Sequence, residues 1–292
     1  MIWYSLSLKH LQCLLRLSTS LSQPSYRLGR ILSTVTVQLP PNHAKNTRML
    51  SASALECKIL SEEYVKQTSE FIATSTMDTP IKRYLNVPFE VLLRYYGMLT
   101  RRAVQHGVSA IVIDTDLNIV VGAILVYVYS NETELVNDEV DDFPGLRTLK
   151  PNLTLMREMQ KRMFKFKEMT GSSGSKGKIC EMCYGGVLES YRQHGLALKL
   201  GLRSMMEAMG KGATMFFGYP TSLEGQTMMA RLSYMFKEVD SIKYKEIEMK
   251  DGTKPFENFS YKFEDVKLML ATSDILRVLA TSDRLRVPKG YI

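Results

Sequence analysis

The segment from Lys178 to Met209 constrains the fold of this chain more than any other feature. Its first ten residues, KICEMCYGGV, have the pattern of a strand, and its last dozen have the pattern of a helix that ends near Met209. A turn containing Gly195 joins the two. The first turn of a helix leaves backbone N–H groups without intrahelical partners, and the helix dipole adds about half a positive charge there. The segment therefore predicts an α/β fold with a phosphate-binding helix start.

The residues of the turn suit a phosphate ligand. Gly195 permits a close approach of phosphate oxygens, Ala197 keeps the next position small, and Arg192 carries a forked donor that matches a phosphate. His194 has a side chain that titrates near neutral pH, but it lies inside the turn. We expect His194 to present its backbone to a ligand and not a titrating ring.

The hexapeptide RQHGLA at 192–197 resembles the acetyl-CoA signature of the GNAT superfamily of N-acetyltransferases, Arg/Gln-x-x-Gly-x-Gly/Ala. Val187 and Tyr191 stand where the family usually shows Val-x-x-x-Tyr-Arg. A second strand, Thr214–Phe217, and another helix follow. Over about Leu55–Asp265 the order of elements looks like the family's α/β fold, a mixed and splayed central sheet with helices on both faces. The alternative is an ordinary strand–helix turn in another fold.

The resemblance implies acetyl-CoA as the co-substrate. In the family the two central parallel strands splay apart, and the pantetheine arm of CoA pairs with the backbone of the strand before the signature. The two adjacent glycines of that strand are consistent with a β-bulge, because glycine relieves the strain of a disrupted ladder. The implied cofactor-binding residues are Tyr184, Gly185, Gly186, Val187, Arg192, Gln193, His194, Gly195, Leu196 and Ala197.

Within the superfamily the chain is most similar to the invertebrate arylalkylamine N-acetyltransferases. Residues 71–81, which end in MDTPI, are similar to the acidic-Pro-aliphatic stretch of that group, and a long helical insertion precedes the signature strand. The group commonly has Glu just before the proline, whereas this chain has Thr79 there and Asp78 one position earlier. The resemblance implies direct acetyl transfer to a primary amine, with a small arylalkylamine as the expected substrate. The alternatives are a protein or peptide amine as substrate, or a catalytically weak CoA-binding module.

Direct transfer requires a group that takes the proton of the ammonium, because a protonated amine is not a nucleophile. Asp78 is the first candidate base, and its alternative role is that of a turn or cap residue before Pro80. Glu181, on the signature strand, is the second candidate. Its alternative role is an ion pair with a neighbouring Lys or Arg.

The departing CoA thiolate benefits from a proton donor. Many superfamily members use a tyrosine in the helix after the second strand, but the alignment places Met229 at that position. Ser222 matches a hydroxyl used in the arylalkylamine group and is the substitute candidate. The same hydroxyl could cap the helix that it opens, and the two roles are compatible.

The remaining periodicity predicts a strand at 57–60, a helix capped by Ser61 that runs to Thr74, and a helix at 88–106 that ends at Gly107. The runs at 108–113 and 119–129 predict a β-hairpin. The long segment at 130–177, between two expected strands, predicts a further helix. Its apolar stripe indicates core packing or, as the minority interpretation, substrate lining; its members are Leu153, Met156, Met159, Met163 and Phe166.

Residues 1–55 carry six basic and no acidic side chains, so the formal net charge of +8 leaves only +2 for the rest of the chain. This composition is typical of a mitochondrial transit peptide, although a poorly ordered extension or a start at Met49 also accounts for it. The expected location is therefore cytoplasmic, or mitochondrial if the leader is genuine. A nearly neutral body argues against nucleic acid as a partner.

Four further features concern membrane spans, metal ligands, an internal repeat and the domain organisation. The longest apolar run, at 119–129, is too short for a membrane span, so none is expected. Cys180 and Cys183 would point to opposite faces of a strand, and no second pair completes a zinc site, so no metal is expected. A nine-residue motif beginning at Leu270 is repeated from Leu279. The expected organisation is a leader at 1–55, an acetyltransferase-like body at 56–265 and a tail at 266–292.

Overall fold

The computed structural model describes residues 54–135, 144–170, 177–192, 194–231 and 234–275. The expected leader therefore lies outside the described residues apart from its last two positions. The second copy of the C-terminal repeat lies outside them as well.

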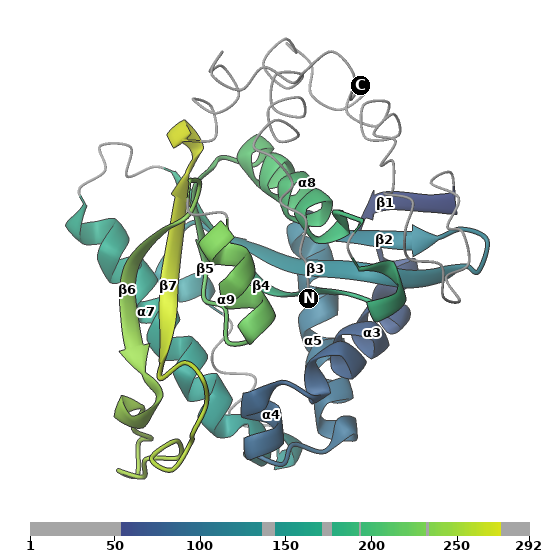
Figure 1. The fold of residues 1–292 in the computed structure, drawn as a ribbon. Helices are drawn as coiled ribbons and strands as arrows, with labels where there is room; N and C mark the ends of the chain where they lie inside the picture. The colour runs from purple at the N-terminus through teal and green to yellow at the C-terminus, as the bar shows by residue number, and fades with distance from the viewer. Residues whose placement is uncertain (1–53, 136–143, 171–176, 193, 232–233, 276–292) are drawn as a thin grey trace.

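The described chain forms a mixed sheet of seven strands in the order β1-β2-β3-β4-β5-β7-β6 (Figure 1). Every neighbouring pair is antiparallel except β4 and β5, which are parallel. This is the mixed α/β sheet that the sequence predicts. The strands are β1 Leu55–Ile59, β2 Ala110–Asp114, β3 Ile119–Tyr129, β4 Lys178–Val187, β5 Ala213–Gly218, β6 Lys237–Lys243 and β7 Asp265–Thr272.

Helices cover both faces of this sheet. One face, which we call the α7 side, is covered by α3, α5 and α7, whose apolar residues share one core cluster with β3 to β7. The opposite face, the α8 side, is covered by α8 and α9. The helices are α3 Val65–Met77, α4 Pro80–Tyr84, α5 Phe89–His106, α7 Lys150–Met169, α8 Leu196–Gly210 and α9 Leu223–Arg231, with short 3-10 turns between them.

Most elements expected in the first half of the chain are present, and one expected detail is wrong. The hairpin is formed by β2 and β3, and α5 ends at Gly107, which adopts the left-handed conformation with φ of 58°. Ser61 does not cap a helix with its hydroxyl, which donates to the Glu63 carboxylate at 3.2 Å instead. A 3-10 turn follows, so α3 begins only at Val65.

The sheet extends past residue 265, where the sequence analysis placed the end of the body. β7 begins at Asp265 and lies between β5 and β6. The first copy of the C-terminal repeat therefore starts inside a strand that has neighbours on both sides. The sequence signal was weak because a strand buried on both faces lacks the alternation that marks a half-buried strand.

The insertion helix α7 packs as predicted. Leu153, Met159 and Met163 are buried in the core cluster of the α7 side, while Met156 and Phe166 are half-buried against it. Leu153 and Met156 also line a cavity described below.

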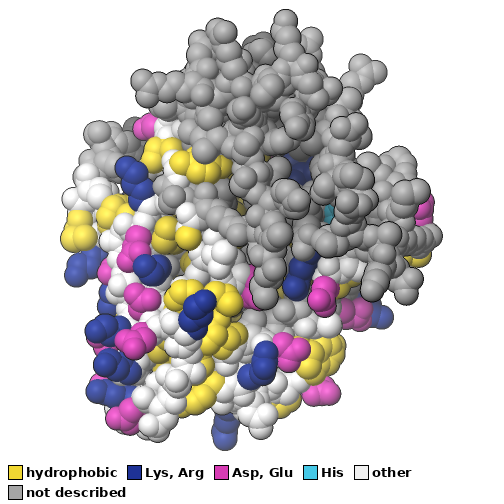
Figure 2. Space-filling model, viewed as in Figure 1, with side chains coloured by type: hydrophobic (Ala, Val, Ile, Leu, Met, Phe, Trp, Pro, Cys, Tyr) yellow, Lys and Arg dark blue, Asp and Glu magenta, His cyan; other side chains and the backbone are white. Residues whose placement is uncertain are grey.

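The described surface mixes charges of both signs. Figure 2 shows Lys and Arg side chains alternating with Asp and Glu on the described part of one face, without a continuous basic stripe. Among the described helices, none has the length and apolar character needed to cross a bilayer. No group of three or more His, Cys, Asp or Glu side chains in the described ranges is arranged to hold a metal ion.

Candidate active site

The two parallel strands separate at the centre of the sheet. β4 pairs with β5 from Lys178 to Met182, whose partner is Gly218, the last residue of β5. β4 then continues for five residues, to Val187, paired with β3 but with no strand on its other edge among the described residues. Backbone N–H and C=O groups along that edge pair with no strand among the described residues, so an extended ligand could pair with them.

A β-bulge lies where the separation begins. Leu125 of β3 is opposite Tyr184, whereas Val126 is opposite Met182, so Cys183 is the extra residue. The sequence analysis placed the bulge at Gly185–Gly186, which is wrong: these glycines pair in register with Ile124 and Ala123. The bulge changes the face to which the side chains after Cys183 point.

The bulge changes which side chains share a face. Before it, Glu181 points to the α7 side; after it, Tyr184 points to the same side, although simple alternation over three residues would send it to the other. Cys183 and Tyr184 both pack against the α7-side cluster, and Cys180 belongs to the α8-side cluster. The expectation that Cys180 and Cys183 face opposite ways is therefore confirmed.

Glu181 is fully buried and is surrounded by hydrogen-bond donors. The Tyr129 hydroxyl donates to Oε2 at 2.9 Å, and the Gln160 amide donates to Oε1 and Oε2 at 3.0 and 3.1 Å. The Tyr219 hydroxyl donates to Oε1. Three donors and no acceptor form the pattern that an ionised carboxylate satisfies. The alternative of an ion pair with Lys or Arg does not fit, since these three neighbours are uncharged.

A small cavity of about 30 Å³ borders Glu181. A cavity of this size has room for a water molecule. Four tyrosines and several apolar side chains form most of the wall, which is closed on one side by α7. The lining residues are Tyr95, Leu99, Tyr127, Tyr129, Leu153, Met156, Arg157, Gln160, Glu181, Cys183 and Tyr184. The wall is thus mainly aromatic and apolar, with one carboxylate, from Glu181.

The tyrosines that line this cavity or contact Glu181 are held as neutral donors. Burial raises the pKa of Tyr95, and burial together with neighbouring acidic groups raises the pKa of Tyr129 and of Tyr219 well above the usual value. The Tyr95 and Tyr184 hydroxyls hydrogen-bond each other at 2.9 Å. Burial also raises the pKa of the Cys183 thiol, against the opposing effect of its hydrogen bond with Tyr219. Neither Tyr219 nor Cys183 is a ready anion at neutral pH.

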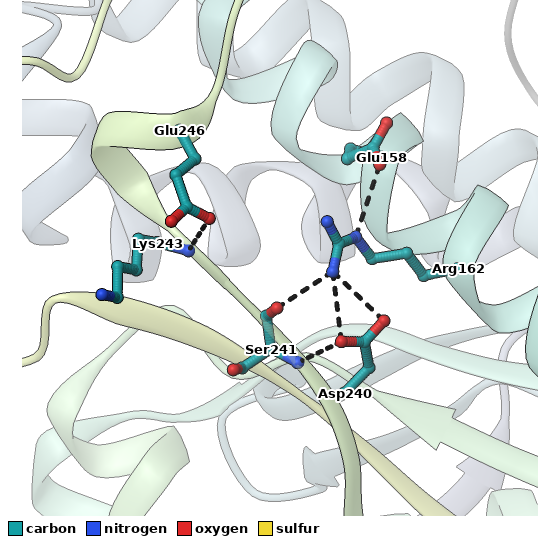
Figure 3. A network of polar contacts seen from close by, with 6 residues as sticks. All are labelled: Glu158, Arg162, Asp240, Ser241, Lys243 and Glu246. Carbon is teal, nitrogen blue, oxygen red and sulfur yellow. Dashed lines mark hydrogen bonds and ion pairs between the residues drawn. The ribbon is translucent and has the colours of Figure 1, made fainter.

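Two neighbouring side chains of the wall helix α7 hydrogen-bond to strands of the sheet. Gln160 reaches the buried Glu181, and two residues later Arg162 donates to both Asp240 carboxylate oxygens at 3.1 Å and to the Ser241 carbonyl at 3.0 Å (Figure 3). Glu158 lies 3.4 Å from the same guanidinium. β6 therefore fixes the register of α7, which in turn fixes Gln160 over Glu181.

The signature turn has the expected conformation at its central residue. Gly195 is the N-cap of α8 with φ of 69° and ψ of 8°, the left-handed region that glycine adopts without cost. The first intrahelical acceptor of α8 is the Gly195 carbonyl, which receives the Lys199 N–H at 3.0 Å. The N–H groups of residues 196–198 precede that bond and have no intrahelical acceptor, so they form a potential anion site.

The other residues of the turn have mixed positions. Arg192 is exposed, and its Nε donates to the Val187 carbonyl at 3.1 Å, which ties the turn to the end of β4. His194 is half-buried, whereas Gln193 lies outside the described residues. Tyr191 is buried and donates to Asp114 at 2.6 Å, so it anchors the turn to β2.

The first candidate base, Asp78, lies away from the cavity. Its side chain is 79% exposed, its carboxylate is 3.9 Å from Arg83 Nε, and it is not among the cavity residues. Asp78 follows the last residue of α3, and Thr79 is the N-cap of α4. The structure therefore does not bring the two candidate bases, Asp78 and Glu181, into one site.

Ser222 opens α9, where its Oγ accepts the Gly225 N–H at 3.1 Å. The cap interpretation is thus present in the structure. Met229, at the position of the family's tyrosine, is buried among apolar residues of the α8 side.

Tyr219 is a residue of this site that the sequence did not predict. It follows the last β5 residue paired with β4, and its hydroxyl lies between the Glu181 carboxylate and the Cys183 thiol. A signal existed: functional side chains concentrate at the carboxyl ends of parallel strands where the order of strands changes direction. Tyr129 and Gln160 had no such signal, because each comes from an element distant in sequence.

Comparison with known proteins identifies the fold. No protein-family model matches the sequence, and no curated protein matches it either. Among solved structures, arylalkylamine N-acetyltransferase 2 from Aedes aegypti is similar with a TM-score of 0.60 and 19% identity, covering 75% of this chain and 98% of that chain.

Two further structures share this architecture. A polyamine N-acetyltransferase of Drosophila melanogaster that forms N-acetylagmatine has a TM-score of 0.60 and 14% identity, covering 75% of this chain and 99% of that one. The C-terminal condensation domain of Ebony, in complex with beta-alanyl-dopamine, has a TM-score of 0.55 and 16% identity, covering 75% of this chain and 98% of that chain. The chain therefore has the GNAT fold that its signature predicts.

Proposed function

We propose that this protein is an acetyl-CoA-dependent N-acetyltransferase that acts on a small primary amine of the arylalkylamine class by direct transfer. One observation carries the proposal: the free edge of β4 connects a helix start suited to phosphate with a buried carboxylate beside an aromatic cavity. A fold alone does not define an activity, so the argument depends on this arrangement.

The described residues fit CoA. The N–H groups at the start of α8 suit a pyrophosphate, and a Cβ at position 195 would be strained at the observed φ. The free edge of residues 183–187 suits the amide groups of a pantetheine arm, which need backbone partners. Seven of the cofactor residues proposed from sequence belong to these two features: Tyr184, Gly185, Gly186 and Val187 on the free edge, and Gly195, Leu196 and Ala197 at the helix start. Arg192 and His194 lie in the turn between the two features, and Gln193 is not described. Bound there, acetyl-CoA would supply the activated acetyl group.

The amine side of the site is supported by the cavity. Tyr95, Tyr127 and Tyr129 offer aromatic faces and edges, and Glu181 offers the negative charge that a primary ammonium requires. We propose Glu181 as the group that takes the ammonium proton, because it is the candidate base that lines the cavity. Asp78 remains a candidate only if an amine approaches along the exposed end of α3.

The cavity is smaller than an arylalkylamine, so the proposal requires it to open. Met156 is the adaptable part of the wall: it is half-buried, unbranched, and contacts the Tyr184 hydroxyl at 2.7 Å. A rotamer change of Met156 would extend the space along α7 without breaking the Gln160–Glu181 hydrogen bonds.

The test is turnover by the full chain. Purified protein is incubated with acetyl-CoA and a panel of phenylethylamine, indolylethylamine, a linear polyamine and an N-terminal peptide amine, and thiol release is followed. We expect turnover above hydrolysis for the aromatic amines. CoA binding without turnover for any amine would favour a catalytically weak CoA-binding module, and preference for the peptide would favour a protein substrate.

The compartment is a separate proposal, which depends on the composition of residues 1–55. A fluorescent protein fused after residue 55 should enter mitochondria if these residues act as a transit peptide. A diffuse cytosolic signal would contradict that role.

A further inference from the structure

We infer that Tyr219 is a catalytic acid that protonates the departing CoA thiolate and is itself reprotonated by Glu181. This inference rests on the proposed acetyltransferase function. The observation behind it is that one hydroxyl joins the two central strands at the point where they separate: Tyr219 follows β5, and its hydroxyl donates to Glu181 of β4.

Position favours Tyr219 over the other hydroxyls and thiols nearby. The thioester of a CoA molecule lying along residues 183–187 would reach the site at the last paired residues, Met182 and Gly218. Tyr219 is the next residue after Gly218, and its hydroxyl also contacts the thiol of Cys183, the bulged residue that follows Met182. It therefore stands at the base of the gap between the strands.

Two other residues are less suited to this role. The Ser222 hydroxyl is committed to the start of α9, and nothing in its contacts leads back to a base. The Cys183 thiol lies 3.9 Å from the Glu181 backbone carbonyl, and burial together with the Glu181 carboxylate raises its pKa well above the usual value. Tyr219 combines a location at the gap with a hydroxyl that donates directly to the carboxylate that would hold a proton.

The protons balance in this scheme. The ammonium releases one proton to Glu181, the nitrogen–carbon bond forms, and the carbon–sulfur bond breaks with its electron pair on sulfur. The Tyr219 O–H proton passes to the thiolate, and the Glu181 carboxylic acid returns a proton to the phenolate oxygen. The amide nitrogen loses its second proton to water, so the products are amide, CoA thiol and one released proton.

The hydrogen bond between Tyr219 and Glu181 also explains the order of the two proton transfers. The negative charge of Glu181 is one cause of the raised pKa of Tyr219, the other main cause being burial. When Glu181 takes the amine proton, that charge disappears, and the carboxylic acid can donate to the phenolate. Tyr219 therefore becomes a better acid only after the amine has been deprotonated.

The test compares three Tyr→Phe variants, each of which removes one hydroxyl. Tyr219→Phe removes the proposed acid. Tyr129→Phe removes the other hydroxyl bound to Glu181 and so measures the loss from a less well oriented carboxylate. Tyr244→Phe is the control for folding, because its buried hydroxyl has no hydrogen-bond partner among the described residues. For each variant, kcat, KM and CoA affinity are measured with the best amine.

We expect kcat of Tyr219→Phe to fall about 10²-fold, the usual contribution of a general acid. CoA affinity should be unchanged, Tyr129→Phe should lose less than tenfold, and Tyr244→Phe should match the wild type. Equal losses in Tyr219→Phe and Tyr129→Phe would mean that Tyr219 only orients Glu181 and would overturn the inference. Absence of turnover in the wild-type protein would instead overturn the proposed function.

A second measurement covers the case in which Tyr219→Phe does not fold. In single-turnover experiments with the wild-type protein in D₂O, proton transfer to the leaving thiolate should slow acetyl transfer by about twofold or more. An unchanged rate would contradict a proton donor at this step.

Discussion

The two faces of β4 are both buried, but their contents differ. On the α8 side the strand presents Cys180, Met182 and Val187, which pack against apolar residues. On the α7 side it presents Glu181, Cys183 and Tyr184, each within a network of hydroxyl and amide groups. The same strand thus presents apolar packing residues on the α8 side and groups that can hold or donate a proton on the α7 side. The proposed anion site uses the backbone at the start of α8, and the proposed chemistry uses side chains on the opposite face.

The comparison teaches that a bulge of one residue can distribute functions between faces. Without the bulge at Cys183, Tyr184 would join the apolar α8 side, and the cavity beside Glu181 would lose one of its aromatic walls. On the α7 side, buried polar groups in the network have partners. Lys82 of α4, outside that network, is a charged exception: it is 5% exposed, lies next to Ile81 of the same core cluster, and has no carboxylate partner among the described residues.

The largest expected effect concerns this exception. Burial lowers the pKa of Lys82 from its usual 10.5 to about 7, so the neutral amine is favoured in the folded state and the ammonium in the unfolded state. The resulting cost is absent above pH 10.5, grows as the pH falls, and is complete below about pH 7. Lys82→Met should raise the free energy of unfolding at pH 7 by on the order of 4 kcal/mol.

Denaturant unfolding at pH 7 and pH 10 would measure this difference for Lys82→Met and, as a control, for the exposed Lys66 changed to Met. If the gain in the free energy of unfolding of Lys82→Met were the same at both pH values, the buried charge of Lys82 would not be its cause.

The next largest effect should distinguish the two faces directly. Glu181→Gln keeps the shape of the side chain but replaces one acceptor oxygen with an NH2 donor and removes its ability to take a proton. We expect kcat to fall about 10²-fold or more, with CoA affinity unchanged. The matched control is Glu158→Gln on α7, whose carboxylate is 37% exposed. A large loss of CoA affinity in Glu181→Gln would mean that the faces are not separate.

The smallest effect concerns the α8 side. Gly195→Ala places a side chain in the left-handed region at the helix start, which costs roughly 1–2 kcal/mol and crowds an approaching phosphate. CoA affinity should fall about tenfold or more. Gly212→Ala is the control, because it has φ of 89° just after the other end of α8, with open space around its Cβ position. Both variants should lose stability, and isothermal titration should show that only Gly195→Ala loses CoA. Equal CoA affinities would argue against a phosphate at this helix start.

The sequence predicts the signature strand β4, its turn, and the helices α5 and α8 because each carries a strong local signal. Examples are Gly107 after α5 and Gly195 before α8. It also places Glu181 among the candidate bases. It does not predict the position of the bulge, which depends on the register with β3 and not on the two glycines. It does not predict the partners of Glu181 either, since Tyr129, Gln160 and Tyr219 meet only when three elements fold together.

The position of β7 has a consequence for how the protein is made. β5, which carries Tyr219 at its end, pairs on one edge with β4 and on the other with β7. During synthesis β5 emerges well before β7, so one of its edges stays open to other chains until residue 272 has left the ribosome. A nascent chain stalled before that point would expose a half-built sheet, and Tyr219 would not yet be fixed against Glu181. Tyr219 and Glu181 would therefore become organised only after β7 has emerged and paired with β5.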